Sequence, residues 1–276
     1  MLKVRRTIAY VTLVFIVILS LLPFFILFIN TTRSHAQIMR GFSALPGTSF
    51  FQNLNNVLEN PNMPIVRATI NSFIVSIGTV VVATYFSALT AFGIHAYNFK
   101  GKKTAFVFIL LIMMIPAQVS ALGFINLVDQ LNLRNSFIPL IVPAIASPVT
   151  FFFMIQYMKA ALPLEIIEAA RIDGSNEFMT FNRIVLPLIK PALAVQSIFI
   201  FVGSWNNFFM PAHLLNDPDM HTLPILISRL RGTDFANFDL AQVYTLITIS
   251  ILPVIIVYLV LSKYIVKGVA LGGVKG

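Results

Sequence analysis

The chain has 276 residues, of which 58% are apolar and only 11% are charged. Ordinary soluble domains have about 25% charged residues, so this chain has too few charges to cover a water-soluble globule. Its 26 phenylalanines exclude an intrinsically disordered chain, and the lack of cysteine excludes disulfide scaffolds and thiolate metal sites. A net charge of +9 suggests nucleic-acid binding in a soluble protein, but here it raises the question of which membrane face carries it.

Six long windows contain no Asp, Glu, Lys or Arg, and each supplies the roughly 20 apolar residues that a membrane span needs. Strand alternation is absent, which predicts an all-α integral membrane protein. The first window resembles a secretory signal, but it exceeds the roughly 7–15 residues of a signal core, so we favour an uncleaved helix. We expect one transmembrane domain over residues 1–276, with spans at about 8–30, 68–97, 104–127, 136–158, 191–214 and 240–262.

The distribution of Lys and Arg among the loops predicts the orientation of the chain. If the N-terminus is cytoplasmic, thirteen Lys and Arg residues face inside and six face outside, whereas the acids divide into four inside and six outside. All of the net charge then lies on the cytoplasmic side. We therefore expect both termini in the cytoplasm, a cytoplasmic loop at 159–190 and an outer loop at 215–239.

The predicted spans hold no Asp, Glu, Lys or Arg well inside them, which argues against a proton-driven carrier. His95, near the cytoplasmic end of the second span, is interpreted as an interfacial residue. Neither metal-ligand spacing nor a Ser-His-Asp arrangement is visible, and the turn Gly101–Thr104 lacks the earlier glycine of a phosphate-binding loop. We therefore expect no catalytic residues and no cofactor bound by this chain.

The cytoplasmic loop carries the most local information. Pro163 suits the first turn of a helix, and the small side chains of Ala169 and Ala170 let another surface approach closely. Gly174 can adopt the left-handed conformation that ends a helix, and Ser175 is a good N-cap for a second helix. The sequence therefore predicts a helix over about 163–173, followed by a turn and a second short helix.

Four apolar residues of this loop, Ile166, Ile167, Phe178 and Phe181, need burial. Amphipathic helices lying on the membrane surface are one interpretation. Projection into the cytoplasm, with a partner covering part of the loop, is the other.

The same loop resembles the EAA loop in the membrane subunits of binding-protein-dependent ABC importers. The resemblance rests on the residues and spacing of Glu168, Ala169, Ala170, Gly174, Ile184, Leu186 and Pro187. It implies a type I ABC importer permease fold, in which the EAA helix is the coupling helix that docks on a cytoplasmic ATPase subunit. By the same resemblance, these residues and Asp173 couple to that ATPase.

Two further stretches are similar to carbohydrate permeases of the maltose type. One surrounds Trp205, Asn206 and Asn207 in the fifth span, where an aromatic face and amides could contact a sugar in the substrate path. The other is the C-terminus, which by resemblance contacts the ATPase through Gly272, Gly273, Val274, Lys275 and Gly276. In such importers, the loop between the fifth and sixth spans reaches the binding protein.

The resemblance implies a permease subunit for ATP-driven import of a sugar or oligosaccharide in a bacterial or archaeal cytoplasmic membrane. The implied partners are a homologous second permease, two ATP-binding cassette subunits that carry ATP and Mg²⁺, an extracytoplasmic solute-binding protein and membrane lipid, with no nucleic acid. The alternatives are a polyamine or peptide importer of the same class, an ion-coupled secondary carrier or, with no visible catalytic machinery, a membrane enzyme.

Overall fold

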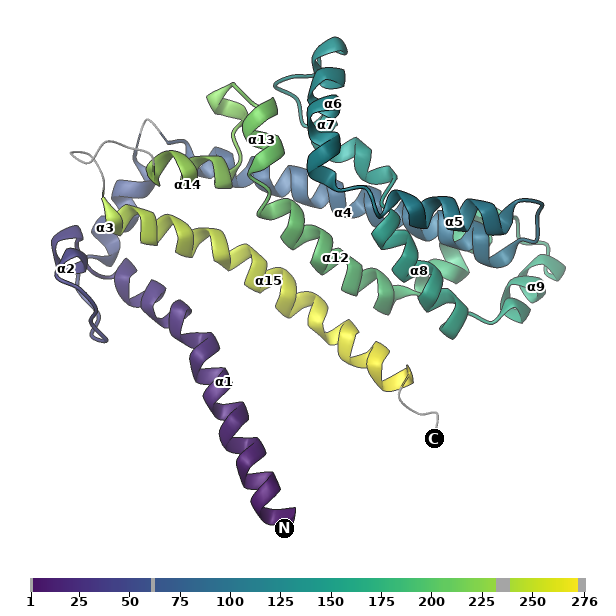
Figure 1. Ribbon diagram of the computed structural model, residues 1–276, viewed down its shortest axis with the longest axis horizontal. Coiled ribbons are helices and arrows are strands. Elements are labelled where there is room, and N and C mark those ends of the chain that lie inside the picture. Colours follow the sequence, from purple (N-terminus) through teal and green to yellow (C-terminus); the bar gives the residue numbers. More distant parts are fainter. Residues whose placement is uncertain (1, 61–62, 232–238, 273–276) are drawn as a thin grey trace. The chain divides into compact units, whose positions relative to one another are not determined.

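The structure is a computed structural model that describes residues 2–60, 63–231 and 239–272. Every regular element in these ranges is helical (Figure 1). In chain order the elements are α1 (Leu2–Thr31), α2 (His35–Met39), α3 (Phe50–Leu58), α4 (Ile65–Ala96), α5 (Lys102–Ile112), α6 (Ala117–Gln130), α7 (Ile138–Ile141), η1 (Val142–Ile145), α8 (Pro148–Ala161), α9 (Leu164–Ile172), α10 (Glu177–Met179), η2 (Thr180–Val185), α11 (Leu186–Leu188), α12 (Lys190–Trp205), α13 (Phe209–Leu214), η3 (Pro218–Met220), α14 (Leu223–Arg231) and α15 (Leu240–Gly272).

The chain divides into two compact units, which are described separately. The first unit comprises Met1–Val66 and Leu226–Pro253, and the second comprises Arg67–Ile225 and Val254–Gly276. The cytoplasmic loop expected from the sequence belongs entirely to the second unit.

Four helical stretches of the described chain are long and apolar enough to cross a membrane by themselves: Val4–Thr31, Ile65–Ala96, Ile138–Ala161 and Leu240–Tyr264. They correspond to the first, second, fourth and sixth predicted spans. A fifth candidate is a bent pair, Glu177–Leu188 with Lys190–Trp205, whose two parts meet at 79°. The chain is therefore a multi-pass membrane protein.

The third and fifth predicted spans differ from single straight helices. Helix α5 ends at Ile112 and α6 starts after Pro116, whose backbone is extended (φ −62°, ψ 127°). Proline lacks the N–H donor of a continuous helix, which explains the interruption within 104–127. The fifth span, expected to reach 214, ends as α12 at Trp205 and continues after a short break as α13.

The fourth span is irregular, as its prolines suggest. Pro139 and Pro143 lie in the first turns of α7 and η1, and Pro148 begins α8. Between η1 and α8, Ser147 departs from helical geometry (φ −106°, ψ 89°). The span is thus built from pieces that each have a proline at the first or second position, where the missing donor is not needed.

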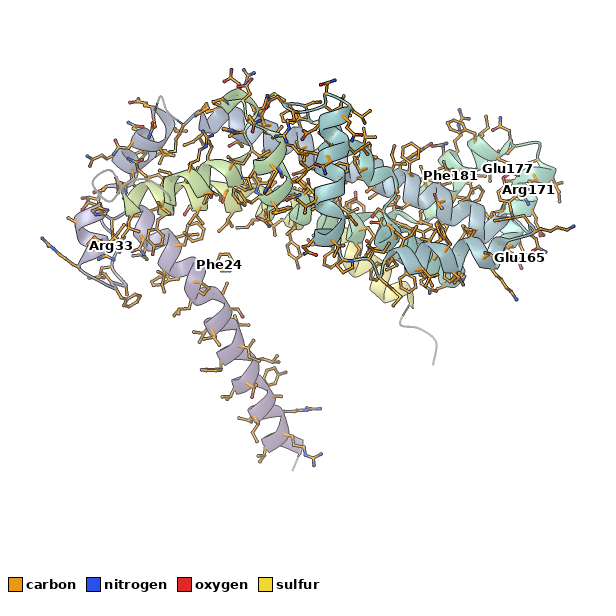
Figure 2. All side chains as sticks on the ribbon, turned by 45° about the horizontal axis from the view of Figure 1, so that its top comes forward. Phe24, Arg33, Glu165, Arg171, Glu177 and Phe181 are labelled. Carbon is orange, nitrogen blue, oxygen red and sulfur yellow. The ribbon has the colours of Figure 1, made fainter. Side chains whose placement is uncertain are left out.

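In the first unit, Arg33 fixes the turn that follows α1. Its side chain is 7% exposed, and its guanidinium donates to Asn30 Oδ1 at 3.0 Å and to the carbonyls of Gln37 and Gly41 (Figure 2). Asn53 Nδ2 donates back to the Arg33 carbonyl at 2.9 Å. Most large apolar side chains of α1 are exposed, which suits a lipid-facing helix.

The second unit has a hydrophobic core in which α4, α8, α12 and the cytoplasmic loop pack together. Helix α8 packs directly against α5 and α12. The core residues of these elements are Ala88, Ala91, Phe92, Ile94, Phe151, Met154, Ile155, Met158, Leu162, Ile167, Phe181, Val185, Ile189 and Ala192. One apolar cluster therefore joins membrane helices to the loop that carries the sequence motif.

At its other end, α4 holds the turn before α14. Asn71 Nδ2 donates to the carbonyls of Asp219 at 2.8 Å and His221 at 3.0 Å, and Ser72 Oγ accepts from the backbone N–H of Leu223 at 2.8 Å. This turn belongs to the expected outer loop 215–239, which is helical in part. Residues 232–238 of that loop lie outside the described ranges.

A second connection on this side involves the segment after α6. Asn135 has a left-handed backbone (φ 51°), and its Oδ1 accepts from the N–H groups of Asn216 and Asp217 at 2.6 and 2.9 Å. Just before it, Arg134 Nη2 donates to Asp129 Oδ2 at 2.8 Å. This hydrogen bond holds the pKa of the Asp129 carboxyl below its usual value.

Candidate functional site

The cytoplasmic loop begins with α9, close to where the sequence predicts a helix. The helix runs from Leu164 to Ile172, so Pro163 is its N-cap rather than a residue of its first turn. Pro163 has an extended backbone (φ −63°, ψ 140°), and its fixed φ leads directly into the helix. Glu165 lies in the first turn, where a negative charge is favourable to the helix dipole.

Gly174 ends α9 as expected. Its φ is +79°, a left-handed value that favours glycine. The N–H of Gly174 bonds to the Arg171 carbonyl at 3.0 Å, and the N–H of Ser175 bonds to the Ala170 carbonyl at 2.9 Å. These two bonds form a Schellman motif, which satisfies carbonyls that the end of a helix leaves unpaired.

The second short helix starts one residue later than the sequence predicts. Its N-cap is Asn176, whose Oδ1 accepts from the N–H of Met179 at 2.8 Å, so the expectation that Ser175 caps it was wrong. The backbone of Ser175 completes the end of α9, and its hydroxyl accepts from Thr180 Oγ1 at 2.9 Å. The two helices are therefore separated by the single unwound segment 173–176.

After α10, the chain forms a π-helical segment, η2, and then the one-turn α11. A π-helical turn holds one residue more than an α-helical turn and is frequent at functional sites. The direction of the chain changes at Ile189, which separates α11 from α12 and is 1% exposed. The bend of 79° between Glu177–Leu188 and Lys190–Trp205 thus falls two residues after Pro187.

The inner side of the loop is buried against α4. Phe181 is fully buried, and its ring contacts Tyr85 edge-on at 5.6 Å and Phe92 at 5.5 Å between centroids. Ile167 of α9 is 1% exposed and belongs to the same cluster. The chain itself therefore buries two of the four apolar residues that needed burial.

Polar contacts fasten the loop to the end of α4 as well. His95 Nε2 lies 2.9 Å from the carbonyl oxygen of Leu162, just before α9. Arg171, near the end of α9, donates from Nε to Glu177 Oε1 at 2.7 Å, and its guanidinium lies 5.2 Å from the ring centroid of Tyr97 (Figure 2). Both ends of α9 are thus held by residues from the last turn of α4 or directly after it.

The outward side of the loop presents apolar side chains around Gly174. Ile172 is 87% exposed and Phe178 is 71% exposed, and Asp173 and Gly174 between them are exposed too. We call these four residues the knuckle. Large apolar side chains at the tip of a rigid turn are typical of a surface that a protein partner covers.

The residues of the sequence motif divide between these two sides. Glu168 and Ala169 are exposed, Pro187 is exposed, and Ile184 and Leu186 are half-buried. Ala170 is only 5% exposed, and its small side chain lets α9 pack closely on its own chain. Its coupling to an ATPase stays a prediction.

The three residues expected along the substrate path differ in how far they are buried. Trp205 is 2% exposed, and its indole stacks on Phe201 at 5.4 Å and meets Phe73 edge-on at 4.8 Å between centroids. Aromatic neighbours therefore pack against the Trp205 ring in this structure, and its contact with a sugar stays a prediction. Asn206 and Asn207 are exposed at the break between α12 and α13.

The expected C-terminal contact falls mostly outside the described residues. Gly272 is the last residue of α15, and Gly273, Val274, Lys275 and Gly276 lie beyond the described ranges.

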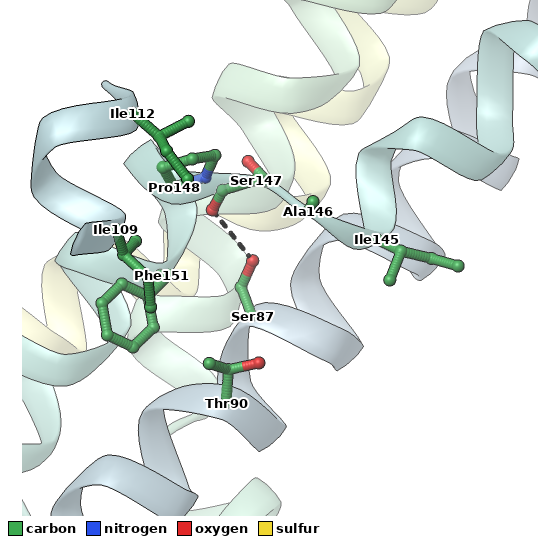
Figure 3. A pocket seen from close by; sticks show the side chains of 9 residues that line it. All are labelled: Ser87, Thr90, Ile109, Ile112, Ile145, Ala146, Ser147, Pro148 and Phe151. Carbon is green, nitrogen blue, oxygen red and sulfur yellow. Dashed lines mark hydrogen bonds between the residues drawn. The ribbon is translucent and has the colours of Figure 1, made fainter. Parts of the chain in front are cut away.

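A pocket of 290 Å³ that the sequence did not indicate lies where the third and fourth spans are interrupted (Figure 3). Ser87 Oγ donates to the Ser147 carbonyl at 3.3 Å across it, and Thr90 adds a third hydroxyl-bearing residue. Ile109, Ile112 and Phe151 make the rest of the wall largely apolar.

The apolar spanning helices, with a helix–turn–helix loop between two of them, define a multi-pass membrane protein. Residues 83–271 match the family described as the binding-protein-dependent transport system inner membrane component. The chain belongs to this family.

Named relatives span almost the whole chain. It is 36% identical over 262 residues to the arabinooligosaccharides transport system permease protein AraQ of Bacillus subtilis (strain 168), covering 94% of this chain and 92% of that protein. It is 28% identical to the sn-glycerol-3-phosphate transport system permease protein UgpE of Yersinia pestis over 264 residues, 94% of either chain. It is also 28% identical to the lactose transport system permease protein LacG of Rhizobium radiobacter over 257 residues, 93% of this chain and 92% of that protein.

One solved structure has the same fold. It is a chain of a bacterial ABC transporter involved in the import of the acidic polysaccharide alginate, with a TM-score of 0.83 and 22% sequence identity. The match covers 95% of this chain and 96% of that chain.

Proposed function

We propose that the chain is one permease subunit of an ATP-driven importer of a sugar or oligosaccharide. Family membership makes it a membrane component of binding-protein-dependent transport. The ATP-driven part of the proposal is supported by the knuckle. The inner side of the loop packs against α4, whereas Ile172 and Phe178 of the knuckle are exposed and available to a partner. The chain provides a docking surface and half of a pathway, and bond chemistry takes place elsewhere.

The proposed partners follow from this role. Two ATP-binding cassette subunits hold ATP and Mg²⁺ in the cytoplasm, and one of them docks on the knuckle. A homologous second permease completes the pathway. A binding protein delivers the solute to the side of α4 that carries Asn71, and both termini lie in the cytoplasm. This arrangement gives a rigid-body switch between inward- and outward-open states.

The sugar assignment is supported by two of the relatives, whose names specify arabinooligosaccharides and lactose, whereas the name of UgpE specifies sn-glycerol-3-phosphate, a phosphorylated polyol. Its test is uptake into vesicles that contain this chain with the subunits that copurify with it. Arabinooligosaccharides, lactose, putrescine and a dipeptide are offered with the cognate binding protein. We expect uptake of a saccharide alone, and uptake of putrescine or the dipeptide alone would overturn the assignment.

The energy source is tested in the same vesicles. We expect uptake to stop when internal ATP is hydrolysed and to continue when ionophores collapse the ion gradients. The reverse result identifies an ion-coupled carrier, and the proposal is then wrong. Copurification of an ATPase with the wild-type chain, and its loss on changing the knuckle, connects the energy source to this surface.

A further inference from the structure

A basic pocket of 480 Å³ lies where α4 ends, α5 begins and α8 ends. Lys102, Lys103 and Lys159 line it together with His95 and Asn98, and no acidic residue does. Three cationic side chains around one concave space create a strongly positive potential. The lining of the pocket includes no residue of the knuckle, although His95 also contacts the Leu162 carbonyl just before α9.

The lysines are positioned by contacts that leave their charges unpaired. Lys102 Nζ donates to the Tyr97 carbonyl at 2.8 Å, and Lys159 Nζ lies 5.0 Å from the ring centroid of Phe106. In the part of the chain that the structure describes, none of the three forms an ion pair with a carboxylate. A compact anion that enters the pocket can therefore interact with all three charges.

The first turn of α5 adds to the same site. Helix α5 has 11 residues and starts at Lys102, after Gly101 in a left-handed conformation (φ 89°), and no side chain caps it. The first N–H groups of a helix have no intrahelical partners and favour a phosphate or other anion. Backbone donors thus supplement the lysine charges.

The wall of the pocket is apolar and continues into surface that faces lipid. Ile94, Phe106 and Val107 line it, and Val107 is 51% exposed. On the same helix, Phe108 is 62% and Leu111 is 57% exposed. A ligand that suits this pocket carries an anionic head for the lysines and an apolar tail for the surface of α5.

We propose that this pocket binds the headgroup of an anionic phospholipid from the cytoplasmic leaflet. Basic pockets between membrane helices on the cytoplasmic side recognise such headgroups, and that leaflet supplies anionic lipid. The phosphate interacts with the three lysines and the first turn of α5, and an acyl chain lies along Val107. The site does not depend on which solute the protein carries.

The test is native mass spectrometry of the full chain, purified in detergent with the subunits that accompany it. Dioctanoyl phosphatidylglycerol is titrated against dioctanoyl phosphatidylcholine. We expect retained phosphatidylglycerol on the wild type. Changing Lys102, Lys103 and Lys159 to Gln together should weaken its binding by about a hundredfold, at about fivefold for each lysine.

Two variants control for charge and folding. Lys100→Gln removes an exposed lysine next to the pocket and should bind phosphatidylglycerol like the wild type. Changing the three pocket lysines to Arg keeps the charge and should restore binding. Unchanged phosphatidylglycerol binding in the triple Gln variant overturns the proposal, as does equal binding of phosphatidylcholine to the wild type.

Two other outcomes identify different ligands. If inorganic phosphate binds the wild type as tightly as phosphatidylglycerol, the pocket recognises a free anion and the lipid assignment is wrong. If the triple Gln variant loses the ATPase while phosphatidylglycerol binding is unchanged, the pocket is a protein contact. Failure of sugar uptake would not affect the conclusion on lipid binding, because lipid retention is measured without transport.

Discussion

His95 Nε2 lies 2.9 Å from the carbonyl oxygen of Leu162, which connects the last turn of α4 to the residue just before the N-cap of α9. A carbonyl oxygen only accepts hydrogen bonds, so Nε2 carries the proton and donates. The bond spans 67 residues of sequence and stands beside the contact of Arg171 with Tyr97. Together these contacts fix the position of α9 relative to the C-terminal end of α4.

Replacing His95 with Phe should loosen the start of α9 without unfolding the protein. The change leaves the Leu162 carbonyl without its donor, and one lost hydrogen bond is worth about 1 kcal/mol, or about a fivefold rise in local opening. Amide hydrogen exchange over residues 164–172 measures this rise. His95→Gln places a donor at a similar reach and should exchange like the wild type, and equal exchange in the Phe variant would contradict the role of the bond.

Three substitutions at Gly174 separate backbone strain from charge at the knuckle. A Cβ there meets nothing within 4 Å, so any penalty comes from the left-handed backbone. Gly174→Ala should destabilise the turn by about 1–2 kcal/mol, whereas Asn adopts this conformation more readily. Gly174→Asn should therefore retain most uptake, and Gly174→Asp should insert normally but abolish uptake and coupled ATP hydrolysis. Wild-type uptake in the Asp variant is incompatible with coupling through the knuckle.

Phe178 and Phe181 form a matched pair on opposite sides of the loop, with 71% and 0% of their side chains exposed. Phe181→Ala removes a buried ring from the core and should destabilise the second unit by about 3–5 kcal/mol. Phe178→Ala should change stability by no more than about 0.5 kcal/mol. It should weaken ATPase binding by about tenfold, measured by titration of the purified subunit. Equal effects of both variants on stability would contradict the finding that Phe181 is buried and Phe178 is exposed.

Trp205→Ala should act on stability rather than on solute affinity. Its ring packs between Phe201 and Phe73, so truncation should lower the free energy of unfolding by about 3–5 kcal/mol. Thermal unfolding of the purified protein measures the loss. Asn206→Ala, at an exposed neighbour, should leave stability within about 0.5 kcal/mol. A stable Trp205→Ala protein with a raised KM for the solute would return this residue to the substrate path.

Asn71→Leu should release the turn at 219–223 from α4. The His221 carbonyl loses its donor and the Asp219 carbonyl keeps only Arg67 Nε, at 3.2 Å, and the loss of about 1–1.5 kcal/mol corresponds to about tenfold faster exchange of amides in this turn. Binding of the solute-binding protein, followed by fluorescence anisotropy, should weaken in parallel if it contacts this turn. Unchanged exchange would show that Arg67 and Ser72 are sufficient to hold the turn.

The sequence predicted local backbone features better than contacts between residues that are distant in the chain. Gly174 ends a helix because its backbone requirement is local, and four spans match long apolar stretches for the same reason. The burial of Trp205 could not be predicted, because its neighbour Phe73 lies 132 residues away in the chain and no local pattern reveals such a contact. The burial of Ala170 could not be predicted either, because the motif specifies a small residue without indicating which surface approaches it. The basic pocket joins Lys159 to a turn near residue 102, a pairing that only the fold creates.

Helix α4 links two distant surfaces with one straight element. Asn71 and Ser72 hold the outer turn, whereas Phe92 and His95 hold the loop that carries the knuckle. These attachment points are about 35 Å apart along a helix that rises about 1.5 Å per residue. Because the turn at 219–223 and the loop that carries the knuckle are attached to the same helix, we expect a movement of the knuckle to be transmitted along α4 to that turn.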